Sequence, residues 1–411
     1  MKPNAFALIA ICSTFLQSDA WSDPLSLSDA VSRALEKSPA LAPYSAELRI
    51  ADAKLVTALA RPNPELEVEA EDILGSGEYR EFESAVYNVG ISQLIELAGK
   101  RKQRAEIARA GQEAEAHRYE AARREIIAET ANRYIETLAA QAIEENAVHD
   151  LRIADEIVKK LELLREGGRG SEIEIGQAEL GKNEATLVLE SARRESTIAR
   201  TRLAATWADT EPDFSSVTGS LQPPSQPSHS LEELKSETCD HPALLLASSQ
   251  VDVSKEELTL QEKEKTPDLT LGLGYRRDSA IDDNAVVLGF SLPLPLFNKN
   301  EGGIAEASAN IEKSRALENQ TRSTLELAVA EAHARLRSAT KEYDLISHKM
   351  LPAAQKQHQT LAEGIELGRV KYLDLLEARR ALNAVRKQQI DSLIRYHSAR
   401  VQIESLCGTE P

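Results

Sequence analysis

The chain has 411 residues, of which 28% are charged and 4% aromatic, and its formal net charge is −17. This acidic balance makes nucleic acid an unfavourable partner, because phosphate backbones are bound by basic surfaces. The shortage of large rings favours narrow seams between helices over one thick core. From charge alone, solvation of long helices explains the acidity better than a cation-tolerant channel does.

The first 20 residues have the features of a secretory signal peptide. Lys2 supplies the positive start, residues 6–16 form an apolar run, and a small-x-small pattern ends at Ala20, after which we expect cleavage. The run is shorter than the roughly 20 residues of a transmembrane helix. A lipid anchor at Cys12 is disfavoured, because Ile11 stands where a lipoprotein signal has a small residue. The mature chain is therefore expected to be exported without a transmembrane helix.

Short motifs recur at an offset of about 200 residues, which indicates an internal duplication. Ser-Pro-Ala-Leu at 38–41, for example, corresponds to His-Pro-Ala-Leu at 241–244. A stretch rich in proline at 218–230 separates the halves and is expected to be an exposed connector. The predicted repeats are 21–220 and 221–411. In each, the pattern predicts a short helix, a helix, two strands, a very long helix, a loop and a long helix.

Four segments alternate apolar and polar side chains, as strands with one apolar face do. They are 65–73, 87–95, a third that starts at Leu269 and alternates through Leu271, Leu273 and Tyr275, and 287–296. Their length of about nine or ten residues matches the 9–11 residues of a tilted membrane-spanning strand. Four strands cannot close a barrel, and lipid does not tolerate an open strand edge. Several copies of the chain are therefore expected to share one barrel.

The predicted helices are too long for an ordinary globule. Residues 99–165 contain no proline and predict one helix of about 100 Å at 1.5 Å per residue. In 303–365, apolar residues are spaced by four and three, which predicts a coiled-coil seam. The seam consists of Leu325, Val329, Ala332, Leu336, Ala339, Tyr343, Ile346 and Met350. Pro352 is expected to kink this helix, and the return helices are expected to begin near Glu172 and Tyr372.

The two predicted hairpin tips correspond closely. Gly168 and Arg169 in the first tip match Gly368 and Arg369 in the second, and an acid follows each glycine by six residues. Those acids are Glu174 and Asp374. Glycine ends a helix in the left-handed conformation and an acid favours the next helix N-terminus, so capping alone explains much of the pattern.

With the duplication and the tips, the segments 289–303, 351–353 and 372–376 give the chain a resemblance to the TolC family of outer-membrane efflux proteins. They look like its CzcC/CusC branch, which serves heavy-metal efflux pumps of the RND type. The resemblance implies an α+β membrane channel: a homotrimer whose twelve-stranded β-barrel, four strands per chain, lies in outer-membrane lipid and continues into a periplasmic α-helical coiled-coil barrel. It also implies a periplasmic adaptor protein and an inner-membrane RND pump as partners.

The resemblance further assigns roles to the tips. It implies a pore entrance formed by Asp374, Glu377 and Glu174, where a ring of carboxylates attracts cations. It implies adaptor contact at Gly168, Arg169, Gly368 and Arg369. Plain helix capping and a cation at a helix C-terminus are the alternatives for these acids and arginines. We expect the second hairpin to move more than the first, because it carries Pro352 and two of the three acids.

The sequence offers no catalytic constellation. His117, His149, His333, His348, His358 and His397 lack the four-residue spacing that puts two imidazoles on one metal. We therefore expect no enzyme, no cofactor and no high-affinity metal site. Pairing of Cys239 with Cys407 is left open, because an oxidising compartment permits a bond without requiring it.

The leading hypothesis is therefore a passive exit duct for heavy-metal cations in a tripartite pump. The alternatives are the same channel serving drug efflux and a structural or adaptor coiled-coil protein of the periplasm.

Overall fold

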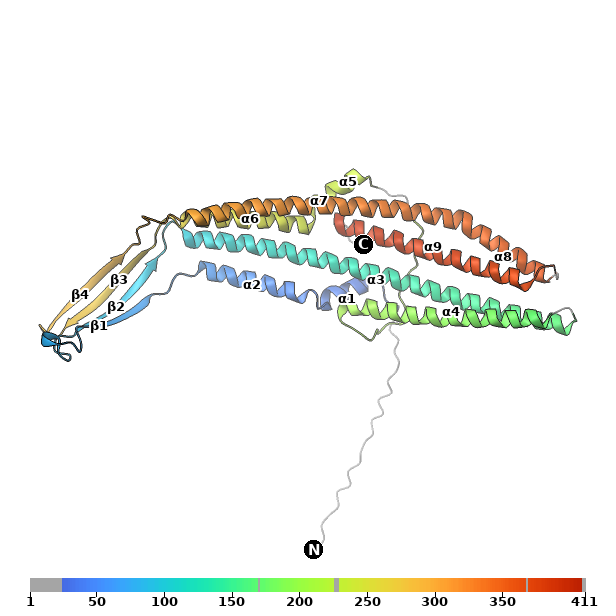
Figure 1. The fold of residues 1–411 in the computed structure, drawn as a ribbon, viewed down its shortest axis with the longest axis horizontal. Helices are drawn as coiled ribbons and strands as arrows, with labels where there is room; N and C mark the ends of the chain where they lie inside the picture. The colour runs from blue at the N-terminus through green and yellow to red at the C-terminus, as the bar shows by residue number, and fades with distance from the viewer. Residues whose placement is uncertain (1–23, 169–170, 225–228, 367–368, 409–411) are drawn as a thin grey trace, which may run out of the picture.

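Each half of the chain folds into short helices, a strand pair and a long helical hairpin (Figure 1). The computed structural model describes residues 24–168, 171–224, 229–366 and 369–408, so the predicted signal peptide lies outside it. The first half comprises α1 (Leu27–Lys37), α2 (Ala42–Leu59), β1 (Glu65–Glu71), β2 (Val86–Ile95), α3 (Lys100–Glu166) and α4 (Glu172–Ala204). The second comprises α5 (Leu231–Glu237), α6 (Pro242–Lys263), β3 (Leu269–Asp278), β4 (Asp283–Ser291), α7 (Glu301–Leu345), α8 (Leu351–Glu366) and α9 (Tyr372–Cys407).

The four strands form one antiparallel sheet in the order β1-β2-β3-β4. The fourth strand was predicted at 287–296, and these bounds are wrong. The strand β4 begins earlier, at Asp283, and ends earlier, at Ser291. Pro293 and Pro295 explain the early end, because proline has no N–H to donate to a strand partner. The β3–β4 loop is correspondingly shorter than the sequence suggested.

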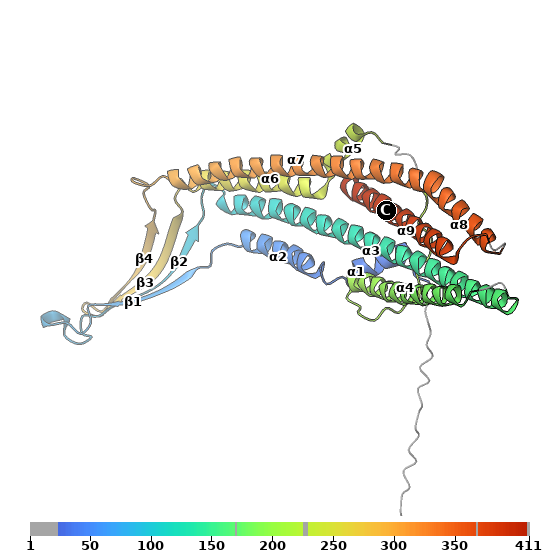
Figure 2. The same ribbon diagram turned by 45° about the vertical axis from the view of Figure 1, so that its right-hand side comes forward.

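The elements form a long curved wall (Figures 1 and 2). The sheet occupies one end. Beyond it, α2 packs on α3, α3 on α6, and α6 on α7. In the far half, α4 packs on α3, α3 on α9, and α9 on α7 and α8. One lateral edge of the wall is thus formed by β1, α2 and α4, and the other by β4, α7 and α8.

The first long helix is confirmed: α3 is 67 residues long and has no break. Helices of this length are stabilised by tertiary seams more than by their own propensity. On the second long helix, the predicted seam is buried at Leu325, Val329, Ala332, Leu336, Ala339 and Ile346. It packs against Tyr396, Ala399 and Ile403 of α9. The prediction is wrong at Met350, which is 37% exposed.

The seam ends where the helix changes its hydrogen-bond pattern. A π turn at Ile346–Met350 separates α7 from α8, and the N–H of Leu351 donates to the carbonyl of Ile346, five residues back. Pro352 follows at once. A proline in a helix lacks the N–H and crowds the carbonyl four residues earlier, and a π turn is one way of relieving this crowding.

A cluster of charges around a buried lysine joins the sheet to the helices. The ammonium of Lys100 lies 3.0 Å from Asp268 Oδ1 and 3.2 Å from Glu264 Oε2, and its side chain is 3% exposed. The N–H of Leu97 donates to the same Asp268 carboxylate at 2.9 Å. Burial alone would lower the pKa of Lys100, but the hydrogen bonds with Asp268 and Glu264 raise it above its ordinary value. The cluster ties the start of α3 to the segment that enters β3.

A second core lies at mid-length, where the chain crosses between halves. Phe214 and Trp207 are buried with residues of α1, α3 and α4. The hydroxyl of Tyr134 donates to the carbonyl of Thr218 at 2.7 Å and lies 3.0 Å from that of Leu25. These contacts fix the start of the connector against α3.

Cys239 and Cys407, the cysteines among the described residues, are free thiols, so the disulfide left open by the sequence is not formed. Cys239 is exposed, whereas Cys407 is half-buried with its Sγ 3.6 Å from the carbonyl of Leu234. Burial raises the pKa of Cys407 to about 12, with a further contribution from the nearby Glu237 carboxylate. The Cys407 thiol therefore stays protonated and unreactive at neutral pH.

The two hairpins pack closely near their tips around a glycine. Tyr372 and Leu376 of α9 are buried against α3 and α4. A Cβ atom added at Gly181 of α4 would lie 2.6 Å from the Tyr372 hydroxyl oxygen and 3.3 Å from Leu376 Cδ1. Only glycine therefore allows α4 and α9 to approach this closely at that level.

We predict that Gly181→Val destabilises the contact between the hairpins by about 1–3 kcal/mol, as overpacking of a filled core does. The matched control is Gly176→Ala, on the same helix, where an added Cβ meets nothing within 4 Å. This control should be neutral or slightly stabilising, because alanine is the better helix former. Denaturant unfolding of the two variants measures the difference, and equal stabilities would contradict the prediction.

Candidate functional site

One face of the sheet is a continuous apolar surface. Residues paired across antiparallel strands point to the same face. The register aligns two such rows, Leu66–Ile91–Leu273–Leu288 and Val68–Val89–Tyr275–Val286. These side chains are exposed in the single chain, and on β4 Leu288 and Phe290 are 80% and 82% exposed. An apolar area of this kind marks a surface that contacts lipid or protein.

The opposite face of the sheet is polar. Its rows are Glu65–Ser92–Gly272–Gly289, Glu67–Gly90–Gly274–Val287 and Glu69–Asn88–Arg276–Ala285. Ser92 donates a hydrogen bond to Glu67 across the first two strands at 3.2 Å. A sheet with one apolar and one polar face is the pattern of a barrel wall between lipid and a water-filled lumen.

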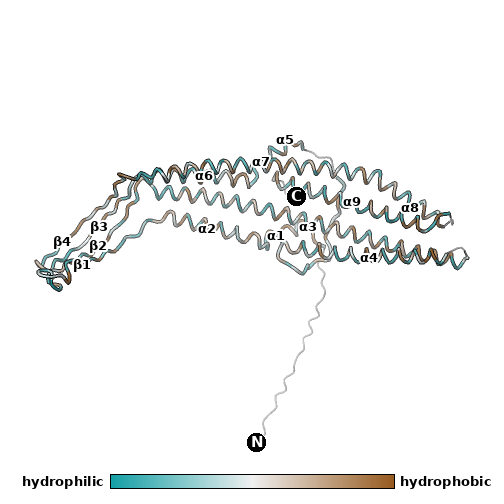
Figure 3. Tube along the Cα trace, viewed as in Figure 1, coloured by the Kyte–Doolittle hydropathy of each residue, from teal (hydrophilic) through white to brown (hydrophobic). Residues whose placement is uncertain are grey.

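The described helices are patterned differently from the sheet. Figure 3 shows apolar and polar residues alternating over short distances along them. Within the described residues, no helix has a stretch both long and apolar enough to cross a membrane.

The first hairpin tip turns at a left-handed glycine. Gly168 has φ +75° and its N–H donates to the carbonyl of Arg165 at 2.8 Å. The Arg165 guanidinium then reaches across the turn to Glu172, 3.0 Å away, at the start of α4. Glu174, predicted at the pore entrance, is partly buried in the first turn of α4. Arg169, predicted as an adaptor contact, lies outside the described residues.

The second tip presents its predicted residues more openly. Arg369 is exposed, and its N–H donates to the carbonyl of Gly364 at 2.9 Å. Asp374 and Glu377 are exposed in the first turns of α9. Gly368 lies outside the described residues. Both tips lie at the end of the molecule opposite the sheet, so the three predicted acids share one end (Figure 1).

Asp374 has a structural role in this fold. Its carboxylate accepts a hydrogen bond from the backbone N–H of Lys371 at 3.3 Å, which caps the start of α9. The capping carboxylate is still exposed at the surface. Asp374 therefore does cap α9, and this role does not prevent its exposed carboxylate from attracting cations.

The structure also brings together a buried cluster that sequence reasoning missed. Arg379 of α9 is 4% exposed and Asp150 of α3 is 8% exposed. The Arg379 guanidinium donates to the carbonyl of Gly181 on α4 at 3.0 Å, and its Nε lies 3.6 Å from Asp150 Oδ1. At the surface beside it, Arg380 bonds both oxygens of Glu184, at 2.6 and 2.7 Å. The cluster links the two hairpins, and no local sequence pattern marks it.

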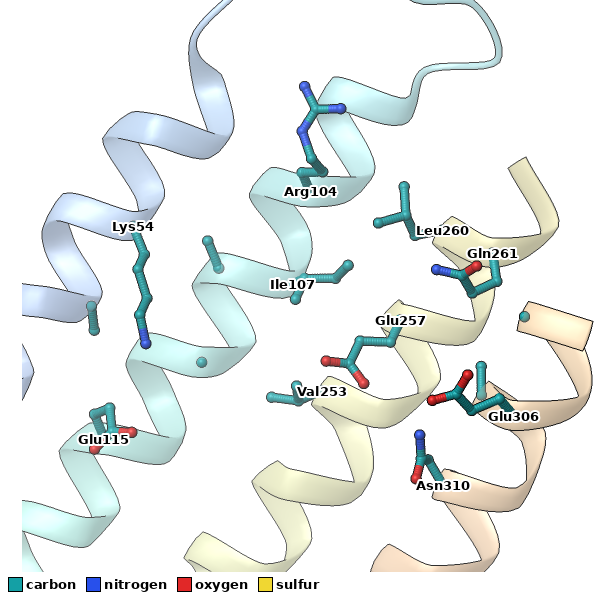
Figure 4. A pocket seen from close by; sticks show the side chains of 15 residues that line it. Lys54, Arg104, Ile107, Glu115, Val253, Glu257, Leu260, Gln261, Glu306 and Asn310 are labelled. Carbon is teal, nitrogen blue, oxygen red and sulfur yellow. The ribbon is translucent and has the colours of Figure 1, made fainter. Parts of the chain in front are cut away.

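A groove of about 640 Å³ lies between α2, α3, α6 and α7 (Figure 4), on the half of the molecule nearer the sheet (Figure 1). Lys54 and Arg104 line it from α2 and α3, and Glu257 and Glu306 line it from α6 and α7. The groove is lined by side chains of both charges, and its lining residues do not include a nucleophile next to a base, as a catalytic site of that type would. Within the described residues no three His, Cys, Asp or Glu side chains gather as a metal site would require.

Comparison with known proteins agrees with this architecture. The family model "Outer membrane efflux protein" matches residues 30–209 and 234–409. The cobalt-zinc-cadmium resistance protein CzcC of Cupriavidus metallidurans is 27% identical over 388 residues, covering 94% of this chain and 90% of that protein. The nickel-cobalt-cadmium resistance protein NccC of Alcaligenes xylosoxydans xylosoxydans is 26% identical, and the alignment covers 75% of this chain and 69% of the NccC chain.

Solved structures share the fold. CusC, whose structures were solved in connection with transmembrane channel formation, is 17% identical and superposes with a TM-score of 0.77 over 93% of this chain and 91% of the CusC chain. A membrane protein from Pseudomonas aeruginosa, with 18% identity, gives 0.78 over 93% and 90%. The resemblance to outer-membrane efflux channels seen in the sequence is confirmed, and the alternative of a periplasmic structural protein loses its support. Because the family model covers most of both halves, the chain belongs to the outer membrane efflux protein family.

Proposed function

We propose that this outer-membrane efflux channel works as a homotrimer, the passive exit duct for heavy-metal cations expelled by an inner-membrane RND pump through a periplasmic adaptor. The observation that carries the proposal is the wall with two unfinished lateral edges. The chain belongs to a family of channels, and the energy for transport is assigned to the pump.

The strand edges support ring closure by identical copies. Among the described residues β1 pairs only with β2, and β4 only with β3, so each outer strand keeps a row of unpaired backbone groups. Such groups cost several kcal/mol each in hydrocarbon. Joining β4 of one copy to β1 of the next pairs the backbone groups of both edges. This is a head-to-tail contact, so the same contact can repeat from copy to copy until the ring closes.

In the helical part of the wall, the lateral edge formed by α4 also has side chains that lack a partner. Ile173, Leu180 and Leu187 recur at seven-residue intervals on α4 and are 73%, 65% and 71% exposed. Among the described residues α4 packs mainly on α3 and also contacts α9, but Ile173, Leu180 and Leu187 stay exposed, so this apolar stripe has no partner there. A heptad stripe is the pattern by which one helix packs on another. The stripe supports contact with the α7–α8 edge of a neighbouring copy.

We predict that Leu180→Glu prevents trimer formation, because it places a charge in the middle of this stripe. Thr186→Glu, on another exposed flank of α4, is the matched control and should leave the trimer intact. Light scattering of the detergent-solubilised proteins gives the oligomeric state, and circular dichroism checks that both variants remain helical. A stable Leu180→Glu trimer would remove the stripe from the interface.

The hairpin tips support an entrance and a docking surface at the periplasmic end. In a closed ring, copies of Asp374, Glu377 and Glu174 would gather around the axis and favour cations. Gly168 and Arg369, which are exposed, are proposed adaptor contacts. The same role is proposed for Arg169 and Gly368 on the strength of the sequence alone.

We predict that Asp374→Asn combined with Glu377→Gln lowers the preference of the channel for cations severalfold. Asparagine and glutamine keep an oxygen acceptor, so the cap on Lys371 is retained while both charges are lost. The control replaces two exposed acids far from the tips, Glu312→Gln with Glu326→Gln. Reversal potentials in planar bilayers measure the preference, and unchanged potentials in the tip variant would reduce both acids to structural residues.

Cations of zinc, cobalt, cadmium and nickel are the proposed substrates, on the basis of the resistances named for the related proteins. Deleting the gene should sensitise cells to one or more of these metals, and the wild-type gene should restore growth. Drug efflux through the same channel is the competing reading. Sensitivity confined to organic drugs would favour it and overturn the metal assignment.

A further inference from the structure

His358 of α8 holds an unusual position between the helices of the second hairpin. Its side chain is partly exposed, but its Nε2 atom is buried and has no hydrogen-bond partner among the described residues. A buried polar atom without a partner costs free energy. A protonated ring would cost more, because both ring nitrogens would then need acceptors and the charge would need a counterion.

The charges around His358 are mostly positive. α8 packs against α9 and the π turn. From α9, Arg386 and Arg379 act on the ring, and from α3 only the Asp150 carboxylate opposes them. His348 and Lys349 of the π turn are exposed to solvent. Burial, Arg386 and Arg379 lower the pKa of His358, and Asp150 only partly offsets them.

We propose that His358 is an acid-sensitive contact of the channel. At neutral pH the uncharged His358 ring lets α8 pack on α9 in the second hairpin, and in acid its protonation loosens α8 from α9. As a regulatory property of the duct, this inference rests on the proposed function. α8 is suited to such release because it is an edge helix with the π turn and Pro352 at its start.

The direction of the pH effect follows from linkage. A His358 ring detached from α9 titrates near its ordinary value of 6.5, whereas the packed ring resists protonation. Above that pH both forms are neutral and packing has no proton penalty. As the pH falls below 6.5, the detached form gains a proton that the packed form does not, so detachment becomes favoured.

Two other histidines have a lowered pKa and could blur the result. Burial, and to a smaller degree Arg124, lower the pKa of His241 to about 4, and its Nδ1 accepts the N–H of Ala243. Burial also lowers the pKa of His397, whose Nε2 lies 3.0 Å from the carbonyl of Gln222. Neither residue lies in α8, so a measurement resolved along the chain separates them from His358.

The test is amide hydrogen exchange of the full mature protein in detergent at pH 7.5 and 5.5, corrected for the intrinsic effect of pH on exchange. Peptides covering 353–366 should exchange faster at pH 5.5 by up to about tenfold, the ratio of charged to neutral detached imidazole one unit below 6.5. His358→Gln and His358→Leu, neutral at both pH values, should abolish this increase. His348→Gln, which removes an exposed histidine of the same hairpin, should retain it.

An equal acid response in wild type and both His358 variants would overturn the inference, as would no response in the wild type. Neither result bears on metal export, which the deletion experiment tests separately. Conversely, cells whose deletion strain is sensitive only to drugs would refute the metal assignment and leave the exchange result standing.

Discussion

The unpaired backbone of two outer strands is the constraint on which the rest of this structure depends. β1 and β4 each leave one edge open, and lipid offers no water to satisfy it. The chain must therefore be one segment of a closed wall. The helices continue the width that the strands set, with α2, α3, α6 and α7 and then α4, α3, α9 and α8. Each half of the chain supplies half of this width: two strands of the sheet and half of the helices beyond it.

The junction between sheet and helices shows how this width is kept. Lys100 begins α3 and holds Asp268, which precedes β3, so an element of the first half is tied to one of the second. The Asp268 carboxylate also accepts the N–H of Leu97. Breaking such a buried pair leaves an uncompensated charge, so these contacts favour one fixed arrangement over several. The strands thereby enter the helices in a single register.

Much of the fold followed from sequence because its elements are long and strongly periodic. The strand alternation and the seam from Leu325 to Ala339 each repeat enough times to be decisive. Errors arose where one residue overrides a pattern: Pro293 and Pro295 end β4 early, and the π turn before Pro352 takes Met350 out of the seam. Arg379, Asp150 and Gly181 could not be paired from sequence, because they come from three helices whose relative positions only the folded chain defines.

The two halves share one plan, yet they differ in how firmly their edges are held. In the first, α3 runs without a break and Arg165 clasps Glu172 across the tip. In the second, the corresponding helix is interrupted by a π turn, and within the described part of one chain α8 packs on α9 and on that turn. Arg379, by contrast, anchors α9 to α3 and α4. Within one chain α8 therefore has fewer helices to hold it than α4 or α9, and the two hairpins differ in how they are anchored even though they share one plan.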